Sequence, residues 1–274
     1  MKLKTLVVAS ATLFAVSTGA QANIIDLFND PAGGQNVESD TIGVVDANEA
    51  GSFPSIFGGY RDLVVEKVSQ TVGADDPSLT ANLSVAAGFL SFSTSSVTTG
   101  RAEVQWDGQE QAGQNVEEIN LNLNEDLVNQ VGCPAGGCNA IVFDVLDADA
   151  NFDFEFGIFD NNGVESVLVG TSPGVNFPGA SFNVPFDVWL QPTGTTGTIA
   201  GFEYLILNNG VVDVTNVGAL VLGLNVLSAG NPATARLDVS IDSITKVPEP
   251  ASLALLGLGI AGLGALNGRR RRKA

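Results

Sequence analysis

Between residues 23 and 246, apolar and polar residues alternate along several short segments of the chain. The clearest are 118–124, 151–158 and 237–242; in the second, Phe152, Phe154, Phe156 and Ile158 alternate with polar residues or glycine. A period of two residues is typical of a strand with one buried face. Comparable runs lie at 63–68, 83–92, 102–106, 141–145, 182–190, 202–207 and 219–226. The pattern predicts roughly a dozen strands.

The segments between these strands contain turn residues rather than long helical patterns. Residues 161–163 and 208–210 both read Asn-Asn-Gly, a sequence that favours tight hairpins. Helical period is best developed at 125–131, where we expect one or two turns of helix. Pro185 within the 182–190 run predicts that this strand lies at a sheet edge. Residues 23–246 are therefore expected to form an all-β domain, an antiparallel β-sandwich of jelly-roll-like type.

The N-terminal 22 residues have the three parts of a signal peptide. Lys2 and Lys4 precede an apolar run at 6–16, and the small-x-small triplet from Ala20 to Ala22 follows it. We expect cleavage after Ala22. The alternative, a retained membrane helix, requires an apolar run long enough to cross a hydrocarbon core of about 30 Å, and this run is too short.

The C-terminal residues 247–274 combine a short motif, an apolar span and a basic end. The motif is Val247, Pro248, Glu249 and Pro250, and the apolar span is 251–266. Basic residues follow at Arg269, Arg270, Arg271, Arg272 and Lys273. The span predicts a transmembrane helix, slightly short but assisted by snorkelling arginines. By the positive-inside rule, the basic end stays cytoplasmic and residues 23–246 lie outside the inner membrane. An ordinary single-pass anchor with a proline-rich stalk is the alternative.

This tail resembles the PEP-CTERM sorting signal. The resemblance covers residues 247–274 only and rests on Pro248, Glu249, Pro250, the glycine-rich span and the arginine cluster. It implies a Gram-negative bacterium that makes extracellular polysaccharide. It also implies that a membrane-embedded exosortase recognises the tail, removes it and passes the protein to the cell surface or the exterior. The inner membrane then holds the chain only transiently.

The domain between the two ends is strongly acidic. It contains 5 basic residues against 29 acidic ones, since 7 of the 12 Lys and Arg and 1 of the 30 Asp and Glu lie outside it, so its net charge is near −24. Such a surface repels nucleic acid, and it also repels anionic polysaccharide unless divalent cations bridge the two. We expect no nucleic-acid partner.

The numbers of cysteines and histidines limit the disulfides, catalytic systems and metal sites that the chain can form. Cys133 and Cys138 are the only cysteines and flank a Pro-Ala-Gly-Gly loop, which in an exported protein predicts a disulfide. The chain contains no histidine, which excludes Ser-His-Asp and Cys-His catalysis and most transition-metal sites. We expect no enzyme activity and no catalytic residue; a paired-carboxylate glycosidase is the catalytic alternative that stays open.

We expect no cofactor and no metal ligand set; calcium is the alternative that the acidic residues leave open. Asp147 and Asp149 precede a strand in an every-second-residue acidic series and could ligate an ion, although the series is not an EF-hand. Arg61 is expected to pair with Asp62 or Glu66, or to orient a sugar. Trp106 is expected in the core, and Trp189 is the better candidate for an exposed aromatic ring.

Two function classes follow. The first is an exported, non-catalytic surface or matrix protein with a structural or adhesive role in an exopolysaccharide-rich envelope or biofilm. The second is a lectin-like carbohydrate-binding module, calcium-dependent if the acidic residues hold an ion.

Overall fold

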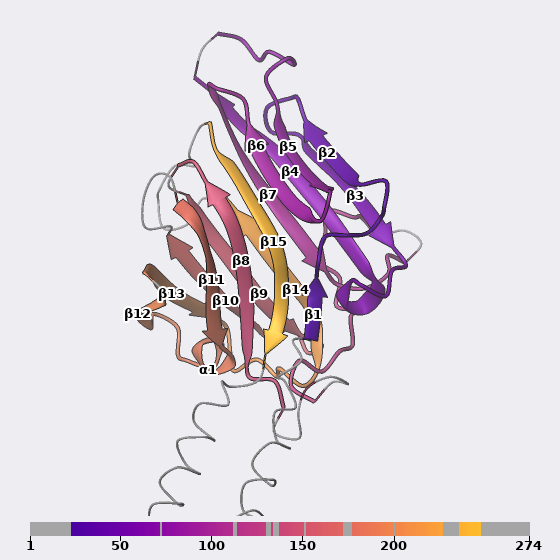
Figure 1. The fold of residues 1–274 in the computed structure, drawn as a ribbon, viewed down its shortest axis with the longest axis vertical. Helices are drawn as coiled ribbons and strands as arrows, with labels where there is room; N and C mark the ends of the chain where they lie inside the picture. Colours follow the sequence, from indigo (N-terminus) through magenta and orange to yellow (C-terminus); the bar gives the residue numbers. More distant parts are fainter. Residues whose placement is uncertain are drawn as a thin grey trace, which may run out of the picture.

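The computed structural model describes residues 23–71, 73–111, 114–129, 133, 137–150, 152–171, 177–199, 201–226 and 236–247. They form two antiparallel sheets packed face to face (Figure 1). Sheet A has the order β11-β8-β15-β6-β5-β2, with β1 paired to β15; sheet B has the order β12-β13-β10-β9-β14-β7-β4-β3. This confirms the predicted antiparallel β-sandwich.

The bounds of the elements are as follows. Sheet A contains β1 (Asn23–Asp26), β2 (Gln35–Ser39), β5 (Ala81–Ala86), β6 (Phe89–Thr94), β8 (Ala140–Ala148), β11 (Phe177–Pro185) and β15 (Asp238–Val247). Sheet B contains β3 (Val45–Gly51), β4 (Tyr60–Gln70), β7 (Thr98–Trp106), β9 (Asp153–Asp160), β10 (Glu165–Thr171), β12 (Thr196–Ile199), β13 (Phe202–Asn208) and β14 (Val217–Leu224). The helices are η1 (Phe57–Gly59) and α1 (Phe186–Trp189).

Most of the predicted strands are present, with some changes at their ends. The run 83–92 forms two strands, because Ala87 and Gly88 adopt positive φ angles of 55° and 88° and turn the chain into a β5–β6 hairpin. The run 182–190 is a strand only as far as Pro185, after which α1 begins. Strand β11 lies at the edge of sheet A, as Pro185 predicted.

Two predicted elements are wrong. Residues 118–124 alternate in polarity but form a loop, because their backbone groups bond to scattered partners: Asn122 N–H donates to Asp107 O and Leu123 N–H to Gly218 O. Residues 125–129, the described part of the predicted helical segment, contain no helix. Their backbone is fixed by other segments instead; Leu127 N–H donates to Val214 O.

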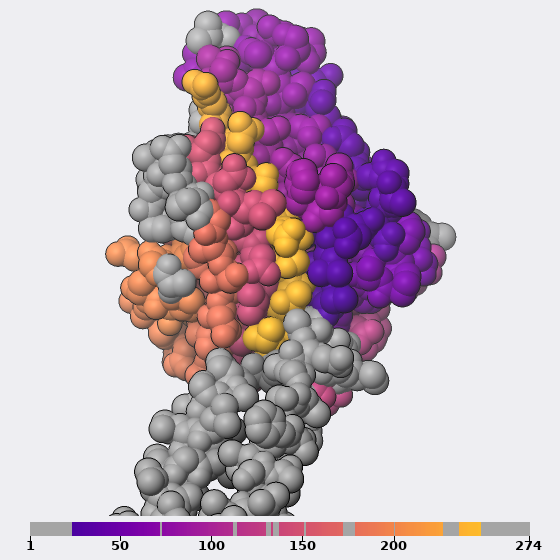
Figure 2. Space-filling model, viewed as in Figure 1, coloured from indigo at the N-terminus to yellow at the C-terminus, as the bar shows by residue number. Residues whose placement is uncertain are grey.

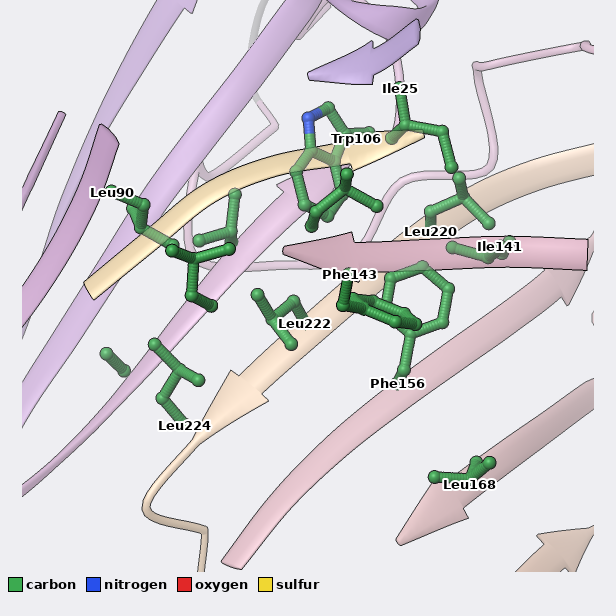
Figure 3. Close-up of a cluster of buried hydrophobic side chains, with 14 of the residues drawn as sticks. Ile25, Leu90, Trp106, Ile141, Phe143, Phe156, Leu168, Leu220, Leu222 and Leu224 are labelled. Carbon is green, nitrogen blue, oxygen red and sulfur yellow. The ribbon is translucent and has the colours of Figure 1, made fainter. Parts of the chain in front are cut away.

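The core lies between the two sheets. Figure 3 shows Ile141 and Phe143 of β8 facing Leu220 and Leu222 of β14 and Phe156 of β9. The Phe143 and Phe156 rings meet edge to face, with centroids 4.9 Å apart, the geometry that aromatic quadrupoles favour. This apolar layer fixes which face of each strand is buried, and therefore which side chains point outward.

The two ends of the described domain lie side by side. Asn23, at the start of β1, is the register partner of Lys246 in β15, and Val247 pairs with Ala140 of β8. Figure 1 shows β15 ending beside the beginning of β1, and Figure 2 shows β15, in yellow, along the middle of the sheet A face. The described domain therefore begins and ends at the same end of the sandwich.

The predicted signal peptide (1–22, with Ala20 and Ala22) lies outside the described residues, as do Pro248, Glu249, Pro250, the span 251–266 and the arginine cluster. Of the helices in the described part of the chain, none has the length and apolar character needed to cross a bilayer.

Candidate functional site

Three polar side chains lie at one level on the outer face of sheet B. Glu49 of β3 is the register partner of Asp62 of β4, which in turn pairs with Gln105 of β7. Cross-strand partners point to the same face of a sheet. The flanking residues Leu63 and Val104 belong to the core on the opposite face, so the three polar side chains point away from the core.

The loop after β7 folds back over these residues and adds two further carboxylates. Glu110 N–H donates to Glu49 Oε2 at 3.0 Å, which ties the loop to β3. Asn120 holds the loop together: its N–H donates to Asp107 Oδ2 at 2.7 Å and its Nδ2 to Glu110 Oε1 at 2.8 Å. The loop leaves Asp62 with 0% and Asp107 with 1% of their surface exposed.

The carboxylates converge, and several of their oxygens receive no hydrogen bond from an N–H or O–H donor. Glu49, Asp62 and Glu110 each place an oxygen within 4.8 Å of the others. Both carboxylate oxygens of Asp62 lack a hydrogen-bond partner, and so do Asp107 Oδ1, Glu110 Oε2 and Gln105 Oε1. Buried polar atoms in folded proteins are nearly always paired, so this concentration of unsatisfied oxygens is unusual. We call Glu49, Asp62, Asp107 and Glu110 the acidic cluster.

Burial and mutual repulsion disfavour negative charge in the acidic cluster. Burial, followed by the nearby charges of Asp107 and Glu49, raises the pKa of Asp62 to about 9. Burial also raises the pKa of Asp107, and burial together with the Asp107 charge raises that of Glu110. The potential ligands that converge here are all carboxylate oxygens, a donor set suited to a hard cation such as calcium or magnesium.

Sequence reasoning did not find this cluster. Its members come from two strands and a loop, and only the sheet register brings them together. In the described part of the chain, this is the sole region where three potential metal-ligating side chains converge. Asp147 and Asp149 are not part of it; both are exposed, and Asp149 Oδ1 accepts a hydrogen bond from Asp238 N–H.

Other residues singled out in the sequence take different positions. Cys133 and Cys138 form the predicted disulfide. Arg61 pairs with neither Asp62 nor Glu66 but with Asp26, at 2.7 Å, because alternation along β4 turns Arg61 inward. The prediction for Trp189 is wrong: α1 turns it into the core, where Nε1 donates to Phe156 O at 3.1 Å. Trp106 is buried, as predicted.

The C-terminal tail agrees with a known sorting signal. Residues 246–272 match the family model of the PEP-CTERM protein-sorting motif. The match covers the tail alone and confirms the resemblance seen in the sequence. It implies an exported protein that is anchored in the membrane at its C-terminus and processed by an exosortase. The matched segment begins at Lys246, so the PEP-CTERM motif overlaps the last two residues of β15.

Solved structures with related sheet arrangements are distant. The family 11 carbohydrate-binding module from Clostridium thermocellum, in complex with a β-1,3-1,4-mixed-linked tetrasaccharide, is 12% identical, with a TM-score of 0.38; the alignment covers 84% of this chain and 98% of the module. PfGH50B is 10% identical with a TM-score of 0.39, over 62% of this chain and 22% of that one, so the chain spans about a fifth of its length. An exo-β-agarase is 15% identical with a TM-score of 0.37; the alignment covers 69% of this chain and 22% of the agarase. No curated protein sequence matches the chain.

Proposed function

We propose that this chain is a non-catalytic surface or matrix protein with a structural or adhesive role in an exopolysaccharide-rich envelope or biofilm. The PEP-CTERM motif implies export and exosortase processing; the role after sorting is our proposal. In its precursor form the chain is anchored by the span 251–266, with the basic residues 269–273 on the cytoplasmic side.

The observation that carries the proposal is the direct connection between the sheet and the motif. Asn139 N–H donates to Val247 O at 3.0 Å, so the last residue before Pro248 is hydrogen-bonded within sheet A. The chain therefore has no linker between the folded domain and the motif. A domain joined this closely to its sorting signal presents the whole sandwich at the envelope surface once the tail is processed.

A non-catalytic role is supported by the burial of the acidic cluster. A glycosidase needs two carboxyl groups on either side of an accessible glycosidic bond. Asp62 and Asp107 lie under the loop after β7 with 0% and 1% exposure, so a sugar ring cannot reach between them. The absence of histidine from the sequence also supports a non-catalytic role, because histidine is the most common general acid or base in enzymes.

The lectin-like alternative has one supporting observation. A groove of about 210 Å³ on the outer face of sheet B is lined by Arg101 and four glutamates, together with apolar residues of β3, β4 and β7. Such groups can bond sugar hydroxyls. However, none of the lining residues is aromatic, and the two tryptophans are buried, so the stacking platform expected of a sugar site is missing from this groove.

The sorting claim is tested with a double variant, Pro248→Ala with Pro250→Ala, expressed in the native host. Proline disfavours helix in the residue before it, so we expect the motif 247–250 to be extended above the membrane. We expect the double variant to accumulate as full-length precursor in the inner membrane, while wild type loses the span and arginine cluster, as measured by fractionation and intact-mass spectrometry. Ser252→Thr, just outside the motif, is the matched control and should be processed normally. Unchanged processing of the double variant would contradict the proposal.

A glycan array distinguishes the structural or adhesive role from the lectin-like role. The array is probed with the purified protein, once in calcium and once in chelator. A structural or adhesive protein gives no saturable binding to a defined oligosaccharide. A lectin gives binding that Glu103→Gln, in the groove, weakens and that Asp187→Asn, on α1, leaves unchanged.

A further inference from the structure

We propose that the acidic cluster binds one calcium ion, held between Glu49, Asp62, Asp107 and Glu110. This inference is independent of the sorting role, because it concerns side chains at the outer face of sheet B rather than the tail. It also differs from the Asp147–Asp149 site that the sequence suggested.

The first argument is the unsatisfied state of Asp62. Its side chain is completely buried, and neither carboxylate oxygen receives a hydrogen bond from an amide, hydroxyl or cationic donor; its hydrogen-bonding contact is with Asp107, itself an acid. Removing a carboxylate from water without a partner is strongly unfavourable. Every neighbouring group that faces it through the sheet register or the loop is acidic or an amide: Glu49, Gln105, Asp107 and Glu110. A bound cation supplies the positive charge that the protein itself does not place there.

Geometry is the second argument. Calcium binds six to eight oxygens at about 2.3–2.6 Å, so two oxygens on opposite sides of one ion lie about 5 Å apart at most. The oxygens of Glu49, Asp62 and Glu110 lie within 4.8 Å of one another. Asp107 Oδ1, the second Asp62 oxygen and Gln105 Oε1 add unpartnered oxygens from neighbouring positions.

The choice of calcium follows from the donor set. Zinc and copper prefer imidazole or thiolate, and the cluster contains neither. Magnesium demands a strict octahedron and keeps most of its water, whereas this cluster supplies several carboxylates from three separate segments. An exported domain also meets calcium at concentrations that suit extracellular sites, whose dissociation constants are about 10⁻⁴–10⁻³ M.

The ion would join the loop after β7 to the sheet. Glu49 and Asp62 belong to β3 and β4, while Asp107 and Glu110 belong to the loop. The same loop carries Glu117 and Glu118, which line the groove beside Arg101 and Glu103. Calcium therefore fixes one side of this groove as well as neutralising the buried acids.

The test uses full-length protein purified in detergent, stripped with chelator and titrated with calcium chloride by isothermal titration calorimetry. We expect one ion per chain and a saturable rise in melting temperature that sodium chloride of equal ionic strength does not reproduce. Asp62→Asn keeps the side-chain shape but removes the charge, so it should weaken binding at least tenfold. Glu110→Gln serves as a second variant. The double variant Asp147→Asn with Asp149→Asn, which removes two acidic groups outside the cluster, is the control and should bind calcium like wild type.

Stability in chelator gives an independent readout. Without calcium, Asp62→Asn should melt at a higher temperature than wild type, because the variant no longer buries an unpaired carboxyl. Absence of saturable binding to wild type overturns the proposal, as does unchanged binding by both Asp62→Asn and Glu110→Gln. If only the Asp147/Asp149 double variant loses binding, calcium binds at that pair and the proposal is overturned. Equal shifts with magnesium overturn the assignment to calcium. None of these outcomes bears on the sorting test, which follows processing of the tail.

Discussion

A buried ion pair in the sandwich depends on a single cation, Arg61. Its guanidinium contacts Asp26 Oδ2 at 2.7 Å and Gln35 Oε1 at 3.0 Å, and it also donates to Asp30 O. Trp106 Nε1 donates to the same Asp26 oxygen at 3.0 Å. Arg61 and Asp26 are 0% and 1% exposed, so neither charge can be solvated if the other is removed.

We therefore expect Arg61→Met to destabilise the fold by about 3–5 kcal/mol, since it leaves the buried Asp26 carboxylate without its counter-charge and with only two neutral donors, Trp106 Nε1 and Phe28 N–H. Arg101→Met is the matched control: Arg101 pairs with Glu66 at 2.6 Å but is 45% exposed, and such pairs contribute about 1 kcal/mol or less. Urea unfolding of both variants measures the difference. Equal losses would show that the buried pair has no special role.

Lys246 is a buried lysine near the end of β15, the last described strand. It is buried, and its Nζ lies 4.2 Å from the centre of the Phe57 ring. Burial lowers its pKa to about 8, against the opposing influence of Glu125 and Asp126. In the unfolded chain the pKa returns to its ordinary value near 10.4. Between these two values the unfolded state binds more protons than the folded state.

The contribution of Lys246 to the free energy of unfolding should therefore rise with pH between about 8 and 10 and stay constant below that window. Comparing wild type with Lys246→Met by urea unfolding at pH 7.5, 8.5 and 9.5 isolates this group. We expect the wild type to gain stability relative to the variant by about 2 kcal/mol between pH 7.5 and 9.5. A difference that does not change with pH would contradict the lowered pKa.

At the scale of elements, the alternation of polarity predicted the strands that have one face in the core. It worked for β9 and β15, whose inward residues Phe156 and Ile241 are buried. It failed for 118–124 because Leu123 is buried beneath the sheet ends while its neighbours bond to other loops. Alternating polarity is typical of a strand with one buried face, but it does not ensure a neighbouring strand to pair with, and β14, which is buried along its whole length, shows that a strand need not alternate.

The loop closed by the disulfide is a second element whose stability can be measured. Cys133 and Cys138 enclose a short segment, and Cys138 N–H donates to Val128 O at 2.9 Å. Because loop-closure entropy grows with loop length, so small a loop contributes only about 2 kcal/mol. We expect Cys133→Ser with Cys138→Ser to lower the free energy of unfolding by that amount without changing the urea dependence. Non-reducing peptide mapping of wild type should show the linked pair, whereas two free thiols would contradict it.

At the scale of the whole molecule, the sequence predicted the C-terminal sorting signal and the fold class because their signals are local. The basic cluster, apolar span and paired prolines occur within 28 consecutive residues. The acidic cluster could not be predicted in this way. Glu49, Asp62 and Glu110 meet only because β3 pairs with β4 in one register and the loop after β7 folds over them. Asp62 does stand beside Arg61 and directly before the apolar run Leu63 to Val65 of β4, which is a local signal at this position.

The net charge of the whole domain leads to a prediction about salt. Residues 23–246 carry 29 acidic and 5 basic side chains, and three ion pairs join Arg61, Lys67 and Arg101 to acids in the described part of the chain. Repulsion among the remaining acids therefore outweighs attraction, and it favours the expanded unfolded state. The Debye length falls from about 30 Å at 0.01 M salt to about 10 Å at 0.1 M, so added salt should screen this repulsion.

We expect the melting temperature in chelator to rise by several degrees between 0.02 and 0.5 M sodium chloride. Potassium chloride should give the same rise, because screening depends on ionic strength and not on the identity of the ion. A melting temperature that is flat or falls over this range would mean that the surface acids lie too far apart to repel one another.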